Sequence, residues 1–214
     1  MKVRSDSFVD GQPLPEALAF ARPDAAARVA LSDNRNPHLF WDEVPEGTRS
    51  FAILCIDPDA PSQPDDVNHP DREIPVELPR VEFIHWVLID LPSEVRVVGE
   101  GEYSSQVTPR GKAGPFLASG ARQGVNDYTQ LFASDHDMGG DYYGYDGPCP
   151  PWNDALIHRY QFVVHALDID RLPIEGRFDG HQVQALLQAH TLALASITGT
   201  YTLNARLRAT RTAV

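Results

Sequence analysis

A short apolar segment that leads directly into two aspartates bracketed by prolines constrains this fold most. Residues 50–56 (Ser-Phe-Ala-Ile-Leu-Cys-Ile) are almost all apolar, which is typical of a buried strand. Asp57-Pro58-Asp59-Ala60-Pro61 follows at once. Proline cannot donate a hydrogen bond to a neighbouring strand and biases the preceding residue away from helix. We therefore expect the chain to leave the sheet here, with Asp57 and Asp59 in a stiff turn at its rim.

A second strand is predicted over residues 82–90 (Glu-Phe-Ile-His-Trp-Val-Leu-Ile-Asp), ending at Leu91-Pro92. Both faces of this strand are apolar, so it is expected at the centre of a sheet, with His85 as the polar exception. Strict alternation assigns Phe83, His85, Val87 and Ile89 to one face, and Ile84, Trp86 and Leu88 to the other.

A third strand is predicted from His158 to Leu167. His158 and Tyr160 are two residues apart and therefore share a face of it. Just upstream, Tyr145-Asp146-Gly147-Pro148-Cys149-Pro150-Pro151 is too rich in proline for a helix or a central strand. This segment is expected to form an extended wall beside His158 and Tyr160.

These motifs resemble the phosphatidylethanolamine-binding protein family, also called Raf-kinase-inhibitor-like, and most of all its bacterial branch. The motifs that carry the resemblance are residues 57–61, His85-Trp86-Val87, residues 147–151 and His158-Arg159-Tyr160, which occur in the family's order. The resemblance extends over roughly residues 30–205. It implies a mainly β fold, in which an antiparallel sheet packs on a second, smaller sheet with one or two peripheral helices.

The resemblance also implies a site that binds a small anionic or phosphorylated ligand. In the family, the positions of Asp57, His85, His158 and Tyr160 line an anion pocket, and Asp59, Pro150 and Pro151 belong to its rim. Backbone N–H groups around Gly147 are expected to contribute donors. The two carboxylates are compatible with an anion if they raise the pKa of the histidines, so that imidazolium donates. Affinity for phosphate would then increase as the pH falls through about 6.5.

Composition favours one domain spanning residues 1–214, with a core over about 30–205 and a long loop over about 104–151. A net charge of −12 argues against nucleic-acid binding, and the arginines of residues 206–211 are interpreted as a solvated tail. No apolar segment is long enough to span a membrane, and because residues 1–6 are followed by no apolar signal-peptide core, export is not expected. With two cysteines expected to be free thiols, the predicted location is the cytoplasm.

One longer helix is predicted near the end of the chain. Asp179 and Gln182 fit a capping box, and apolar residues recur at helical spacing from Val183 to Ile197. Gly199 is expected to end this helix before a closing strand over residues 200–205.

A binding protein is preferred over an enzyme, and no catalytic residue, metal site or organic cofactor is predicted. The alternative is a hydrolase that uses the aspartate, histidine and tyrosine pocket, although no Gly-x-Ser-x-Gly nucleophile motif occurs. A regulatory, inhibitor-like role with an unidentified protein target is a third interpretation. The resemblance to bacterial relatives also raises a homodimer as a hypothesis.

Overall fold

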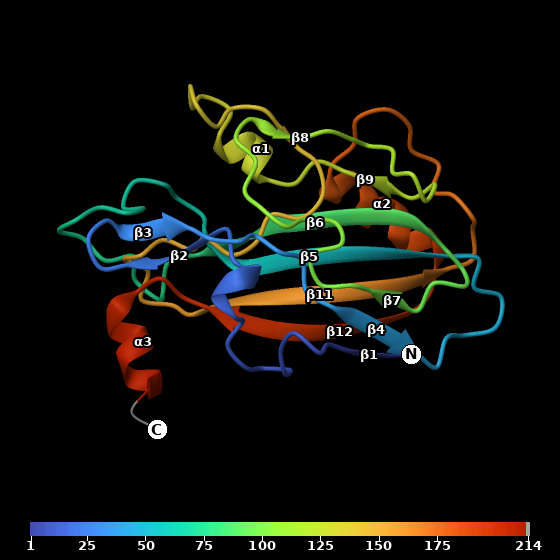
Figure 1. Ribbon diagram of the computed structural model, residues 1–214, viewed down its shortest axis with the longest axis horizontal. Helices are drawn as coiled ribbons and strands as arrows, with labels where there is room; N and C mark the ends of the chain where they lie inside the picture. The colour runs from blue at the N-terminus through green and yellow to red at the C-terminus, as the bar shows by residue number, and fades with distance from the viewer. Residues whose placement is uncertain (213–214) are drawn as a thin grey trace.

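A five-stranded antiparallel sheet forms the centre of the protein, in the order β12–β11–β5–β6–β9 (Figure 1). The computed structural model describes residues 1–212, and the side chains of residues 1–209. The strands of this large sheet are β5 (Ser50–Pro61), β6 (Arg80–Pro92), β9 (Arg122–Gln123), β11 (His158–Leu167) and β12 (Thr191–Tyr201).

A smaller sheet of three strands, β1–β4–β7, packs on one face of the large sheet. Its strands are β1 (Lys2–Arg4), β4 (Leu39–Asp42) and β7 (Val97–Val98). Two further pairs are β2 (Ala21–Asp24) with β3 (Arg28–Leu31), and β8 (Gly111–Lys112) with β10 (Asp141–Tyr142). The helical elements are the 3₁₀ turn η1 (Glu16–Leu18), α1 (Tyr128–Leu131), α2 (Gly180–His190) and α3 (Ala205–Thr212). The predicted fold class, a mainly β protein with two packed sheets and peripheral helices, is confirmed.

Apolar side chains fill both faces of the large sheet. Trp41, Trp86 and Phe162 are fully buried in the core between the two sheets. On the opposite face, Leu54 and Phe178 pack beneath α2, together with Val183 of that helix. The central strands are therefore apolar on both sides, and any polar side chain buried in them needs a specific partner.

A β-bulge at His85 makes the predicted alternation of β6 wrong. Cys55 of β5 pairs with Trp86, and the next residue, Ile56, pairs with Ile84, so that His85 is the extra residue. An extra residue reverses the facing of every side chain beyond it. Phe83 and His85 consequently share a face with Trp86 and Leu88, whereas Val87 and Ile89 lie with Ile84 beneath α2.

The aspartates of the 57–61 motif belong to a strand, not to the expected turn. β5 continues to Pro61, and a register shift lies between Asp57, which pairs with Phe83, and Ala60, which pairs with Val81. Two residues of β5 thus bulge where β6 has one, which accommodates a proline without a backbone donor.

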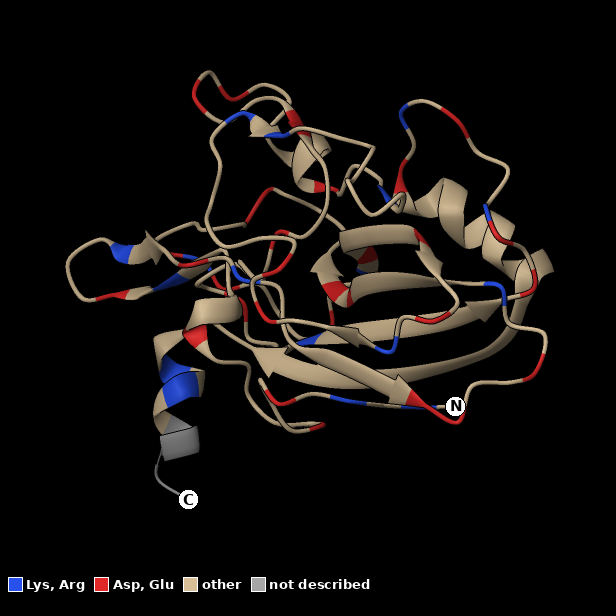
Figure 2. Ribbon diagram, turned by 45° about the vertical axis from the view of Figure 1, so that its right-hand side comes forward, with Lys and Arg blue, Asp and Glu red and all other residues tan. Residues whose placement is uncertain are grey.

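The end of the chain differs from its prediction as well. The capping box of Asp179 and Gln182 is present, but α2 ends at His190 and residues 191–201 are the edge strand β12. Pairing with β11 along the whole of β12 overrides the helical spacing of Leu194 and Ile197. Residues 205–212 form the helix α3 and not an irregular tail, although Arg206, which pairs with Glu73, is still 65% exposed along its side chain. This helix projects from one end of the molecule and carries its basic residues there (Figure 2).

In the described part of the chain, no helix is both long and apolar enough to cross a membrane.

Candidate functional site

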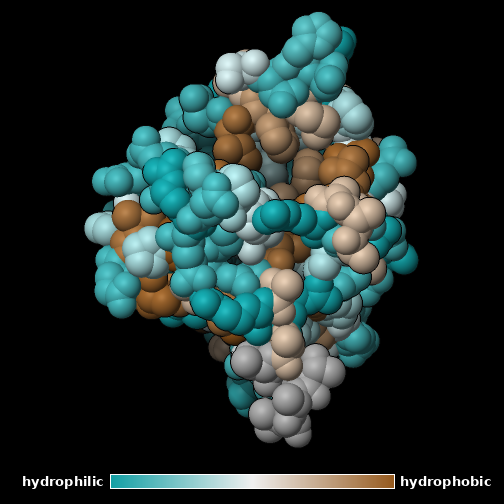
Figure 3. Space-filling view, turned by 90° about the vertical axis from the view of Figure 1, so that its left-hand side faces the viewer, coloured by the Kyte–Doolittle hydropathy of each residue, from teal (hydrophilic) through white to brown (hydrophobic). Residues whose placement is uncertain are grey.

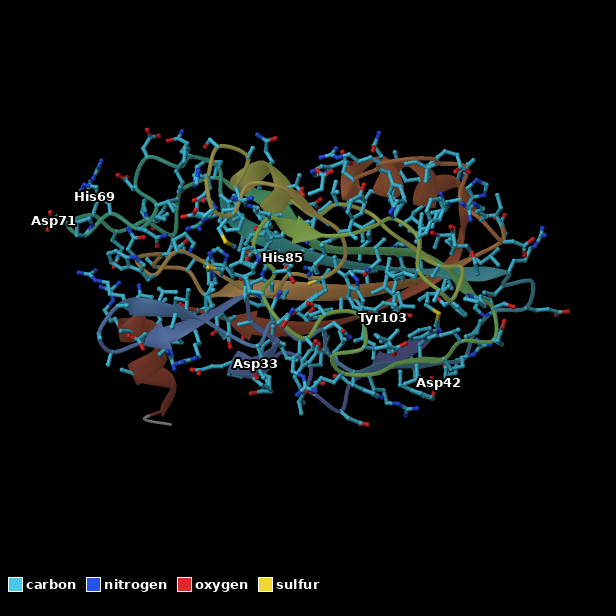
Figure 4. All side chains as sticks on the ribbon, turned by 45° about the horizontal axis from the view of Figure 1, so that its top comes forward. Asp33, Asp42, His69, Asp71, His85 and Tyr103 are labelled. Carbon is cyan, nitrogen blue, oxygen red and sulfur yellow. The ribbon has the colours of Figure 1, made fainter. Side chains whose placement is uncertain are left out.

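Three adjacent strands bring four of the predicted site residues together. Asp57 comes from β5, His85 from β6, and His158 and Tyr160 from β11. Asp57 Oδ2 lies 2.7 Å from His158 Nδ1, and the ring centroids of His85 and Tyr160 are 5.1 Å apart. We refer to Asp57, His85, His158 and Tyr160 as the polar cluster. Figure 4 shows His85 over the middle of the large sheet.

His158 carries a positive charge that two carboxylates hold in place. Its Nδ1 bonds Asp57, and its Nε2 lies 3.1 Å from Asp154 Oδ2. Burial opposes protonation, but the hydrogen bonds to Asp154 and Asp57 outweigh it and raise the pKa of His158 to about 9. Both ring N–H groups are already used, so His158 fixes Asp57 and is not a free donor for a ligand.

His85 is the opposite case. Its Nδ1 lies 2.8 Å from the backbone oxygen of Asp146, and a carbonyl can only accept, so Nδ1 carries a proton. Burial lowers the pKa of His85 below its ordinary value, although the Asp57 carboxylate opposes this. The ring is therefore neutral at pH 7, and Nε2 presents a lone pair. No hydrogen-bond partner of Nε2 occurs among the described residues.

A buried network fixes the orientation of His85 through Asp146. The Asp146 carboxylate accepts from Asn34 Nδ2 at 2.7 Å, Asn126 Nδ2 at 2.8 Å and Lys112 Nζ at 3.0 Å. The Asp146 N–H donates to the His85 carbonyl at 3.0 Å, so the two residues bind each other twice. Sequence reasoning did not assign Asp146 to the site. Its position directly before Gly147 in a recognised motif was the available signal.

Tyr160 has a buried hydroxyl without a partner. The residue is fully buried, and its Oη finds no hydrogen bond within the described part of the chain. Two neighbouring tyrosines of the same core do have partners: Tyr128 Oη donates to Gly147 O, and Tyr145 Oη donates to Leu18 O, both at 2.7 Å. An unpaired buried hydroxyl costs about 1–3 kcal/mol of stability, so its retention calls for an explanation.

Arginines neutralise Asp59 and Asp154, the two carboxylates next to the polar cluster. Arg159 binds Asp59 through Nε and a terminal nitrogen at 2.8 and 2.7 Å, which makes a bidentate ion pair. Burial would raise the pKa of Asp59, but the hydrogen bonds from Arg159 lower it. Arg80 similarly binds Asp154, at 2.6 Å. The sequence analysis did not predict Asp154 as a site residue. It lies four residues before His158 and outside β11, where no motif marks it. With His85 neutral, positive and negative charges around the cluster balance.

The proline-rich segment is held rigidly but contributes few donors. Gly147 N–H donates to Asn34 Oδ1 at 2.7 Å and is thus engaged. A Cβ on Gly147 would lie 2.0 Å from the Leu18 oxygen, so only glycine fits there. Pro150 is buried and Pro151 half-buried, whereas Cys149 is an exposed free thiol. No group of three metal-ligating side chains occurs among the residues described.

Comparison with known proteins decides the family. The sequence profile described as phosphatidylethanolamine-binding protein matches residues 4–202. This chain belongs to the phosphatidylethanolamine-binding protein family. Membership establishes a binding-protein fold and agrees with the motifs that surround the polar cluster.

Bacterial members of the family are similar over nearly the whole chain. UPF0098 protein YbhB of Escherichia coli is 33% identical over 201 residues, which cover 94% of this chain and 99% of that protein. A UPF0098 protein of Aquifex aeolicus is 30% identical over 94% of this chain and 88% of its own length. The crystal structure of Escherichia coli YbcL, described as a member of the mammalian PEBP family, superposes with a TM-score of 0.67. It is 29% identical and covers 94% of this chain and 97% of YbcL.

Proposed function

We propose that the polar cluster binds a small phosphate-bearing ligand in its singly protonated, monoanionic form. The observation that carries this proposal is the buried Tyr160 hydroxyl, which has no acceptor of its own. A phosphate oxygen would supply that acceptor. The nearby Nε2 of neutral His85 is an acceptor and needs a donor, which a protonated phosphate oxygen would provide.

Charge favours the monoanion over the dianion. His158 is protonated but engaged on both nitrogens, and the Asp57 carboxylate remains in the cluster. A dianion would bring two negative charges into a cluster whose own charges balance, whereas a monoanion that donates to His85 brings one. This replaces the expectation that both histidines donate as imidazolium. The affinity for the ligand then depends on pH only through the proton that the ligand donates to His85.

Access to the cluster requires a local movement. Asp57, His85 and Tyr160 are at most 3% exposed, and the half-buried Phe83 ring packs on His85 with centroids 4.8 Å apart. Rotation of Phe83, whose ring contacts His85, is the local movement expected to admit a ligand. Binding is therefore expected to be slower than diffusion permits.

Calorimetric titration with phosphoethanolamine tests the proposal. The wild-type protein should bind it saturably, with affinity rising as the pH falls from about 8 toward 5.5, since a phosphomonoester dianion takes up a proton and becomes a monoanion near pH 6. Tyr160→Phe should weaken binding at least about tenfold, the value of one charge-assisted hydrogen bond. Tyr145→Phe, which removes a hydroxyl bonded elsewhere in the core, is the matched control and should bind as the wild type does.

Two outcomes would overturn the proposal. One is the absence of saturable binding over this pH range, and the other is equal loss in both tyrosine variants. Release of free phosphate during the titration would instead favour the hydrolase alternative, whose nucleophile would have to be identified.

A further inference from the structure

A second, separate cleft lies at the end of the molecule that carries the β2–β3 hairpin and α3. It encloses about 830 Å³, within the range of small-molecule sites. Its lining comes from four segments and includes Pro23, Arg28, Pro70, Trp152, Leu203 and Arg206. Figure 3 looks at this end, a mostly hydrophilic face on which apolar groups surface in separate patches. The cleft shares no lining residue with the polar cluster.

Arg28 is the unusual residue of this cleft. Its guanidinium carbon lies 4.2 Å from the centroid of the Trp152 ring, and it makes no ion pair or hydrogen bond within the described residues. It makes no ion pair with its cross-strand neighbour Asp24, whose Oδ1 accepts from the N–H groups of Ala26 and Ala27. Arg28 also has φ +66°, a conformation that favours glycine at this position of a hairpin. An arginine thus occupies a strained position and turns its charge toward the cleft wall.

The other two cations of the cleft are already paired. Arg206 binds Glu73, and Arg72 binds Asp66 at 2.6 Å. The Asp71 N–H donates to His69, while its carboxylate is exposed at the outer end of the loop (Figure 4). Arg28 is therefore the one cation of the lining without an ion-pair partner in the described residues, and an anion would have to approach it past the carboxylates of Asp24 and Asp71.

Hydrogen bonds hold the walls of the cleft in place in the free protein. Asn153 Nδ2 donates to the backbone oxygens of Asp66 and Arg72, both at 2.7 Å, which holds the 66–72 loop. On the other side, Asn204 Nδ2 donates to Asp154 O at 2.8 Å and anchors the start of α3. A preformed site loses little entropy when it binds a ligand.

We infer that this cleft binds a small organic anion with a flat, apolar body. Trp152, the two prolines and Leu203 offer apolar surface to the body, and Arg28 offers its outward N–H groups to a carboxylate or similar group. This site is independent of the polar cluster, and it requires no phosphate chemistry.

Tryptophan fluorescence titration with phenylacetate tests the inference. Trp41 and Trp86 are fully buried, so Trp152, which is partly exposed, is the residue that should report on the cleft. Phenylacetate should change the emission saturably. Benzyl alcohol, which keeps the ring but has no charge, should bind at least about tenfold more weakly, a difference of about 1.4 kcal/mol.

Arg28→Gly is the decisive variant, because glycine suits φ +66° and the hairpin should fold at least as well as before. In this variant, phenylacetate should lose its advantage over benzyl alcohol. Arg22→Gln removes one positive charge from the same hairpin outside the cleft and should preserve the wild-type preference. Equal binding of the two probes to the wild type, no saturable change, or an unaltered preference in Arg28→Gly would each overturn the inference.

Discussion

Replacing Tyr160 with phenylalanine should make the free protein more stable while it weakens ligand binding. Most buried tyrosine hydroxyls stabilise a fold because they donate a hydrogen bond. Tyr160 Oη has no partner in the described part of the chain, so the folded state bears the cost of desolvating it. Phenylalanine keeps the ring contact with His85, whose centroid is 5.1 Å away, and removes only the hydroxyl.

The size of the effect follows from the two environments. Removing the unpaired buried hydroxyl should increase the free energy of unfolding by about 1–3 kcal/mol. The small cavity left in place of the oxygen reduces this gain. Tyr145→Phe should have the opposite sign. Its hydroxyl donates to Leu18 O at 2.7 Å, and the loss of that bond should cost about 0.5–1.5 kcal/mol. The two variants should therefore differ by about 1.5–4.5 kcal/mol, less the packing loss from that cavity.

Urea unfolding followed by circular dichroism measures this difference, provided that the slope of the unfolding free energy with urea is the same for all three proteins. In a chain of 214 residues, 2 kcal/mol corresponds to about 4–8 °C in Tm. Equal destabilisation in Tyr160→Phe and Tyr145→Phe would refute the reasoning, because Tyr160 would then have a partner in the free protein and would not be reserved for a ligand.

Two further predictions test the supports of the site. Asp154→Asn removes one of the two carboxylates that bind His158, so the His158 pKa, about 9 in the wild type, should fall; an unchanged value in an NMR titration would contradict the assignment. Because that pKa is raised above the unfolded value of 6.5, the stabilisation from His158 should be complete below about pH 6.5 and lost as the pH rises through 9, which pH-dependent unfolding of the wild type and Asp154→Asn can compare. Gly147→Ala should cost about 3 kcal/mol, since its Cβ would lie 2.0 Å from the Leu18 oxygen. Gly99→Ala, whose Cβ would meet only the Glu102 side chain, with its nearest atom at 3.4 Å, should change stability by less than about 0.5 kcal/mol, and similar costs for the two would be evidence against a tightly held proline-rich segment.

The sequence predicted which strands meet, because apolar composition and proline positions report directly on burial and on strand ends. The residues of β11 were predicted as the structure has them, His158 to Leu167. Bulges were not predictable, since an extra residue leaves the apolar pattern locally intact and shows only in the pairing with a neighbour. That is why the facing of Val87 and Ile89 was wrong although the existence of β6 was right.

The site was predictable by residue type but not by role. His85 and His158 look equivalent in the sequence, and the difference between them depends on partners that lie far away along the chain or have no motif of their own. Asp146 gives His85 a carbonyl, whereas Asp154 gives His158 a second carboxylate. The single domain over residues 1–214, the cytoplasmic location, the homodimer and the protein target stay predictions.

The central claim is that the unengaged nitrogen of His85 and the hydroxyl of Tyr160 share one ligand. Nitrogen-15 NMR of the histidine rings, recorded while phosphoethanolamine is added, tests it most directly. We predict that His85 starts as the neutral form protonated on Nδ1, that its Nε2 resonance shifts saturably with ligand, and that this shift is lost in Tyr160→Phe. An Nε2 resonance that stays constant while phosphoethanolamine binds would place the ligand elsewhere and contradict the account.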